Sequence, residues 1–211
     1  MATIALFGAT GREGRRVLDR LLASDADVRV LVRNPDKLTA PPSDRLTVIA
    51  GDALDADAVD RTIAGSQAVI SVLGHVKGSP KNLLTEATTH MVQAMQRQGI
   101  TRIVTLTGGG VRQPQDRPKL PDRIITGLLK VISPQTLADA EGHVEVLRGS
   151  DLDWTVVRGP RLTDKPRRGT YRVGWVGVDA STQVSRDDLA DFLVTQIDDR
   201  EYVHQLPFVS A

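Results

Sequence analysis

Three glycines at three-residue spacing, Gly8, Gly11 and Gly14, constrain the fold of this chain more than any other feature. They follow an apolar run at residues 2–7 that is typical of a buried strand, and aliphatic residues at helical spacing follow them. Glycines also occur in ordinary turns, but a loop between a strand and a helix is the context of a dinucleotide-binding fingerprint. We expect Gly8 to permit the tight turn, Gly11 to let the backbone approach a pyrophosphate, and Gly14 to let the helix pack on the strand.

Strands and helices alternate through the first half of the chain. Further apolar runs predict strands at residues 28–32, 46–50, 68–73 and 102–107. This alternation predicts an α/β fold of the Rossmann type, with a doubly wound parallel sheet and helices on both faces. Aromatic residues make up only 3% of the chain, so the core is expected to be aliphatic. With 211 residues and no visible linker, we expect a single domain over residues 1–211.

The second half is less regular and is expected to hold a small C-terminal substrate region. Residues 124–132 are almost entirely apolar and predict a helix, covered by the core, by a partner or subunit, or by a bound ligand. Residues 138–148 predict another helix, and residues 154–158 a sixth strand. Ser185 and Asp188 resemble a capping box at the start of a last helix.

Charge and composition exclude several kinds of function. The 27 lysines and arginines balance 26 acidic residues, which is unlike the basic footprint of a nucleic-acid-binding protein. The chain has no cysteine, and His90, His143 and His204 lack metal-ligand spacing, so we expect no metal site. We expect these histidines on the surface or on helix faces, with His143 near the substrate crevice as the exception. The sequence shows no basic leader and no apolar run of membrane-spanning length, which predicts a cytoplasmic protein.

Arg33 stands at the position that selects between the two nicotinamide dinucleotides. NAD-preferring proteins have an acidic residue about 20 residues after the glycine motif, where it accepts a hydrogen bond from the ribose 2′-hydroxyl. A guanidinium cannot accept that bond, but it pairs well with the 2′-phosphate of NADP(H). The sequence therefore predicts NADP(H), with Arg12 and Lys37 as further candidates for the phosphate cluster. The alternative for all three is a solvated surface cation, which is favoured for Lys37.

Two more strand ends are expected at the same crevice, because ligands of open α/β sheets lie outside the carboxyl ends of the strands. Asp52 follows the third strand, where it is a candidate acceptor for the adenine amino group or, alternatively, a helix N-cap. Gly74 follows the fourth strand and would allow close approach to ribose or phosphate. His75 is a candidate for the same site or, alternatively, an exposed loop histidine.

These motifs resemble those of the atypical short-chain dehydrogenase/reductase family. Within it the chain is most similar to the biliverdin-IXβ reductase/flavin reductase and NmrA-like NAD(P)-binding proteins, over nearly its whole length. The segments that carry the resemblance are Gly8-Ala9-Thr10-Gly11, Val32-Arg33, Gly51-Asp52, Val72-Leu73-Gly74 and Ser185-Arg186-Asp187-Asp188-Leu189-Ala190.

The resemblance implies which residues surround the dinucleotide. They are Gly8, Thr10, Gly11, Arg12, Glu13, Arg33, Asp52, Ala53, Leu73, Gly74 and His75. It also implies that Thr107 and Pro160 lie beside the nicotinamide, where Thr107 would position cofactor or acceptor unless its hydroxyl bonds its own backbone. Arg161 stands where the flavin reductase has a histidine, so the acceptor stays open. Arg161 is a candidate for attracting an anionic acceptor group, or else an exposed loop charge.

The catalytic pair of typical short-chain dehydrogenases, a tyrosine with a lysine four residues later, is missing from the sequence. The only tyrosines, Tyr171 and Tyr202, are followed at that spacing by Trp175 and Leu206. Interconversion of an alcohol and a ketone needs a proton moved at oxygen, whereas solvent can protonate a reduced flavin, quinone or tetrapyrrole. We therefore expect an NADPH-dependent oxidoreductase that passes hydride to a flavin-, quinone- or tetrapyrrole-like acceptor.

A non-catalytic function is the main alternative. NmrA-like proteins use the nucleotide pocket to sense redox state or to bind a protein partner, and the missing pair fits that function equally well. Residues 124–132 would then be a candidate partner surface. A sugar-nucleotide epimerase is a weaker alternative because it needs the same absent pair.

Overall fold

Parallel strands form the centre of the molecule. The computed structural model describes residues 2–120, 127, 133–178 and 180–211. The strands of the first half are β1 (Thr3–Phe7), β2 (Asp27–Val32), β3 (Leu46–Ala50), β4 (Ala68–Ser71) and β5 (Arg102–Gly108). Those of the second half are β6 (Asp153–Gly159), β7 (Arg161–Thr163), β8 (Arg172–Gly174), β9 (Gln183–Ser185) and β10 (Phe208–Ser210).

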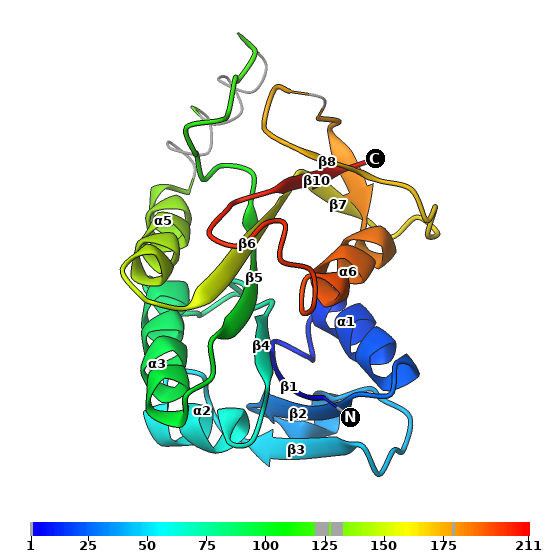
Figure 1. The fold of residues 1–211 in the computed structure, drawn as a ribbon, viewed down its shortest axis with the longest axis vertical. Coiled ribbons are helices and arrows are strands. Elements are labelled where there is room, and N and C mark those ends of the chain that lie inside the picture. The colour runs from blue at the N-terminus through cyan, green and yellow to red at the C-terminus, as the bar shows by residue number, and fades with distance from the viewer. Residues whose placement is uncertain (1, 121–126, 128–132, 179) are drawn as a thin grey trace.

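Among the described residues, eight of these strands form one sheet in the order β3-β2-β1-β4-β5-β6-β10-β8 (Figure 1). Leu6 in β1 lies opposite Val30 in β2 on one side and Ile70 in β4 on the other, in parallel register. Only β8, paired with β10, runs antiparallel in this sheet. The strand order reverses between β1 and β4, and the predicted doubly wound sheet is confirmed. Strands β7 and β9 pair separately.

Helices cover both faces of the sheet, as predicted (Figure 1). On one face lie α1 (Arg12–Ala23) and α6 (Arg186–Thr195), and on the other lie α2 (Ala56–Ile63), α3 (Leu83–Gln98) and α5 (Pro134–Arg148). Side chains of each strand alternate between two aliphatic cores. In β5, Val104 packs toward α1 and α6, and Ile103 packs toward α3 and α5. A short 3-10 helix, η1, spans Pro35–Lys37.

Several local predictions need correction. The alternation of apolar residues did not reveal α2, which Asp55 caps by accepting hydrogen bonds from the N–H groups of Asp57 and Ala58. The alternative for Asp52 as helix N-cap is therefore wrong, since its carboxylate instead accepts from Leu54 N–H at 3.0 Å. The helix predicted at 138–148 begins earlier, because Pro134 occupies a first-turn position where its missing N–H costs nothing.

The apolar segment 124–132 lies outside the described residues except for Gly127. No helix in the described part of the chain is long and apolar enough to cross a membrane.

A buried ion pair fixes the loop that follows β5. Arg158, fully buried in β6, donates to both carboxylate oxygens of Asp116 at 2.7 and 2.9 Å. The guanidinium also donates to the Val111 and Leu206 carbonyls, so the buried charge has several partners. Asp116 in turn accepts from the Val176 N–H at 3.0 Å. The loop is therefore tied to β6 and to the chain just after β8.

Candidate functional site

The glycine loop has the geometry that its spacing predicts. Gly8 has φ +89°, and a Cβ there would lie 2.8 Å from the Val72 carbonyl oxygen in the segment after β4. Gly11 donates its N–H to the Gly8 carbonyl at 2.9 Å and precedes α1 without a side-chain cap. A Cβ on Gly14 would overlap the same carbonyl, so only glycine lets α1 approach β1 this closely. The first-turn N–H groups of α1 have no partner inside the helix and are available to a phosphate.

A groove of about 130 Å³ lies at the carboxyl ends of β1 to β4. Most of the predicted dinucleotide contacts line it. They are Gly8, Thr10, Gly11, Arg33, Asp52, Ala53, Leu73 and Gly74. The loops after four different strands thus meet at one edge of the sheet, as the switch in strand order requires.

Arg33 is the cation of this groove. It directly follows β2 with its side chain exposed, and the described residues give its guanidinium no ion-pair partner. Lys37 lies farther along, at the end of η1, and does not line the groove. Arg33 is therefore placed where an anionic group on the ribose would meet it.

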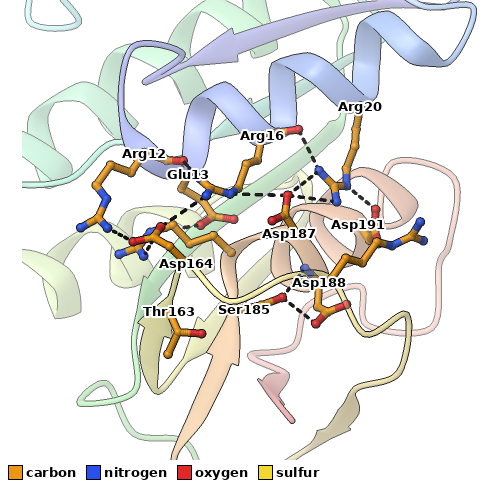
Figure 2. Close-up of polar contacts among 12 residues, drawn as sticks. Arg12, Glu13, Arg16, Arg20, Thr163, Asp164, Ser185, Asp187, Asp188 and Asp191 are labelled. Atoms are coloured by element: carbon orange, nitrogen blue, oxygen red, sulfur yellow. Dashed lines mark hydrogen bonds and ion pairs between the residues drawn. The ribbon is translucent and has the colours of Figure 1, made fainter.

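Arg12 is directed elsewhere. Its guanidinium pairs with Asp164, a residue that follows β7, and Asp164 also pairs with Arg16 at 3.3 Å and Arg186 at 3.0 Å (Figure 2). The side chain of Arg12 therefore joins α1 to the segment after β7 and does not line the groove with Arg33. Its backbone N–H still belongs to the first turn of α1.

Glu13 also turns away from the groove, into the contact between α1 and α6. Its carboxylate lies 3.9 Å from the Arg186 guanidinium, and neither oxygen accepts a hydrogen bond from a described residue (Figure 2). Burial raises the pKa of Glu13 to about 8, against the opposing attraction of Arg186 and Arg16. The side chain of Glu13 therefore does not line the groove.

A second cavity, of about 280 Å³, lies next to the groove, and the two share Val72, Leu73 and Gly74. Predicted residues Thr107, Pro160 and His75 line it. Its wall is otherwise mostly apolar. The side chains that form it include Leu84, Leu106, Ala140 and Leu162. The two hollows are therefore adjacent, and together they extend from Arg33 to the ends of β5 and β6.

Thr107 carries a buried hydroxyl without a partner. Its Oγ1 makes no hydrogen bond to any described residue, so the alternative that it bonds its own backbone is wrong. Thr107 lines the cavity, and leaving its buried hydroxyl unpaired costs about 1–3 kcal/mol.

Arg161 is not brought into the cavity. Its side chain is exposed at the start of β7, whereas its neighbours Pro160 and Leu162 line the wall. Successive residues of an extended chain point to opposite sides, which explains the difference. The predicted contact between Arg161 and an acceptor stays a prediction.

His75 is held by a residue that the sequence did not indicate. Its Nε2 lies 2.8 Å from the carboxylate of Asp139 in α5, whose side chain is 1% exposed. The alternative of an exposed loop histidine is therefore wrong. Asp139 is 64 residues away along the chain and belongs to no motif, so only the packing of α5 on α3 brings the two together.

His143, the histidine predicted as the exception, is buried in α5. Its Nδ1 donates to the Ala140 carbonyl at 2.9 Å, and its Nε2 lies 3.3 Å from the Thr105 hydroxyl. Burial lowers the pKa of His143 to about 4, so the imidazole is neutral at neutral pH.

The fold and this groove define a Rossmann-type dinucleotide-binding protein. Residues 8–200 match the model of a family described as NAD(P)H-binding. The chain belongs to this family. The match confirms the prediction that the cofactor is a nicotinamide dinucleotide.

Similar proteins include named reductases. Over 131 residues, 56% of this chain, the sequence is 30% identical to a 3-diazoavenalumate denitrifying reductase from a Streptomyces species. The match covers 42% of that relative, so this chain corresponds to less than half of its length.

Solved structures with the same fold extend over the whole chain. A short-chain dehydrogenase/reductase from Veillonella parvula in complex with NADP has a TM-score of 0.81 at 18% identity, covering 100% of this chain and 94% of the other. The anaerobilin reductase ChuY from Escherichia coli O157:H7 has a TM-score of 0.79 at 21% identity, covering 99% and 96%.

Proposed function

We propose that this protein is an NADPH-dependent reductase that passes hydride to a planar, conjugated acceptor of the flavin, quinone or tetrapyrrole type. The observation that carries the proposal is that the two hollows are adjacent and share the wall formed by Val72, Leu73 and Gly74. A dinucleotide whose phosphates bind at the glycine loop would extend its nicotinamide toward Gly74 and Thr107, where the groove enters the apolar cavity. An acceptor in that cavity would then lie next to the nicotinamide.

The chemistry of the cavity wall supports such an acceptor. NADPH, when bound, supplies the hydride, and the protein has to hold the acceptor and exclude water. Apolar side chains suit a flat conjugated ring, and the unpaired Thr107 hydroxyl offers one directed hydrogen bond. Neither tyrosine lines the cavity, since Tyr171 and Tyr202 pack on Phe192.

Arg33 supports the choice of NADPH over NADH. It lies in the groove without an ion-pair partner among the described residues, and the groove carries no acidic side chain beside it at the end of β2. A 2′-phosphate would give the guanidinium its charge-assisted bond.

The proposal is tested by NADPH oxidation with FMN, a naphthoquinone and biliverdin as acceptors, alongside the affinity for NADPH. Saturable turnover of at least one acceptor is expected, with a lower rate for Thr107→Val, which keeps the shape of the side chain and removes the hydroxyl. Thr101→Val, a change at an exposed threonine before β5, is the matched control. Tight NADPH binding without turnover of any acceptor would contradict the reductase and favour the redox sensor.

A further inference from the structure

His75 and Asp139 form a hydrogen-bonded pair on the wall of the acceptor cavity. His75 follows the shared residue Gly74 and is partly exposed to the cavity, whereas Asp139 lies behind it, buried between α3 and α5. A buried carboxylate that orients a histidine beside a reaction site is a recurring arrangement in enzymes that move protons.

The contacts of Asp139 fix which nitrogen of His75 carries a proton. Asp139 accepts hydrogen bonds from the N–H groups of Leu84 and Thr85 at 2.7 and 2.9 Å, and from the Thr85 hydroxyl at 2.7 Å. Burial opposes ionisation, but these bonds and the one to His75 outweigh it and hold the pKa of Asp139 below its usual value. An ionised carboxylate is an acceptor only, so the Nε2 of His75 must donate.

The second ring nitrogen of His75 is then free for the cavity. Within the described residues Nδ1 has no hydrogen-bond partner, and His75 is one of the residues that line the cavity. His75 is not needed to cap α3, because Asp139 already binds the two first-turn N–H groups and a hydroxyl without it.

We propose that His75 is the proton donor of the reductase and that Asp139 is its positioning residue. The inference rests on the proposed function. It makes His75 the proton source, whereas the absence of the catalytic tyrosine had led us to expect protonation by solvent. In its donor form His75 carries a proton on both ring nitrogens. It gives the Nδ1 proton to the acceptor heteroatom that is conjugated with the atom receiving the hydride. The acceptor gains one hydride and one proton, NADPH leaves as NADP⁺, and the neutral His75 recovers a proton from solvent.

The first test measures the pH dependence of kcat with a naphthoquinone as acceptor. In the wild type, kcat is expected to fall as the pH rises, because the donor must carry its Nδ1 proton. His143 does not contribute to this pH dependence above about pH 6, because burial lowers its pKa to about 4. His75→Gln can still donate to Asp139 but has no transferable proton. It is expected to lose about 100-fold in kcat together with this pH dependence, with unchanged NADPH affinity.

His90→Gln is the matched control, since His90 lies in α3 and does not line the cavity. It should keep both the rate and the pH profile. Absence of turnover in the wild type would overturn the proposed function and the donor together. Turnover with the same kcat and pH profile in His75→Gln would overturn the donor alone and leave the reductase standing.

A second readout needs no acceptor. Long-range ¹H–¹⁵N NMR spectra of the imidazole rings report which nitrogen carries hydrogen, and they should show Nε2–H for the neutral form of His75. Asp139→Asn should disturb this assignment and lower kcat, with thermal melting to confirm that the variant is folded. A neutral His75 that carries its proton on Nδ1 and none on Nε2 would contradict the geometry on which the donor depends.

Discussion

Arg33 is the residue on which the proposed preference for NADPH depends. It is an exposed cation in the dinucleotide groove, whereas Arg12, the other arginine that the sequence placed there, pairs with Asp164. We expect Arg33→Ala to weaken NADPH binding by about tenfold or more, because a charge-assisted hydrogen bond contributes about 1.5–3 kcal/mol. NADH binding should hardly change. Titration of the protein with each cofactor measures the two affinities. Lys37→Ala is the control and should leave both affinities as they are in the wild type. Equal losses for the two cofactors would refute the assignment.

Glu13 makes the stability of the fold depend on pH. Its pKa is raised to about 8 by burial, above the ordinary value of 4.5, so between these values the folded state binds more protons than the unfolded state. Its contribution is therefore favourable at low pH and is lost as the pH rises toward 8. His143 acts in the opposite direction but only below about pH 6.5, where the unfolded histidine takes up a proton.

We expect Glu13→Gln to become more stable relative to the wild type as the pH rises from about 6.5 to about 8. Urea unfolding across this range gives the difference in free energy of unfolding. Glu145→Gln is the control, because Glu145 is an exposed partner of Arg148. A difference between Glu13→Gln and the wild type that does not vary with pH would contradict the raised pKa.

At the scale of elements, the loop after β5 depends on the buried pair of Arg158 and Asp116. We expect Arg158→Met to lower the free energy of unfolding by about 3–5 kcal/mol, because it leaves the Asp116 carboxylate buried without its counter-ion. Arg97→Met breaks the exposed pair with Asp60 and should cost less than about 1 kcal/mol. Denaturant unfolding compares the two variants, and similar losses for both would show that burial of the pair does not matter.

Elements were predictable from the sequence where a local pattern specifies them. The apolar runs of β1 to β6 and the capping pair at α6 are such patterns, and Ser185 indeed accepts from the Asp188 N–H at 3.0 Å. Asp188 has a further role that no capping box predicts, since it also accepts from the N–H groups of Arg168 and Gly169. The strands β7 to β10 have only three residues each in the described chain, too few for a periodicity, and tertiary pairing defines them.

The two halves of the candidate site also differ in how far the sequence predicts them. Its dinucleotide half follows from the glycine spacing and the strand ends, because parallel strands bring their carboxyl ends to one edge. Its acceptor half does not, since His75 meets Asp139 only through the packing of two helices. The sequence also placed Glu13 at the dinucleotide, but its side chain lies between α1 and α6. Which way a first-turn side chain points depends on the neighbouring helix.

At the scale of the whole molecule, the sheet places the dinucleotide groove and the second cavity at one edge. Strands β1 to β4 supply the groove and the ends of β5 and β6 supply the cavity, so both binding regions belong to the same rigid sheet. Such an arrangement fixes one face of the nicotinamide toward the acceptor. The reductase account therefore predicts a single stereochemical course of hydride transfer.

The most direct test uses NADPH deuterated at C4 of the nicotinamide, separately on each face, with the acceptor that supports the fastest turnover. The account predicts that NADP⁺ loses the deuterium from one labelled form and keeps it from the other, with a slower hydride step for the form that loses it. Mass spectrometry of the product measures this outcome. Tight binding of NADPH without oxidation by any acceptor, or loss of deuterium from both faces alike, would contradict hydride transfer in this site.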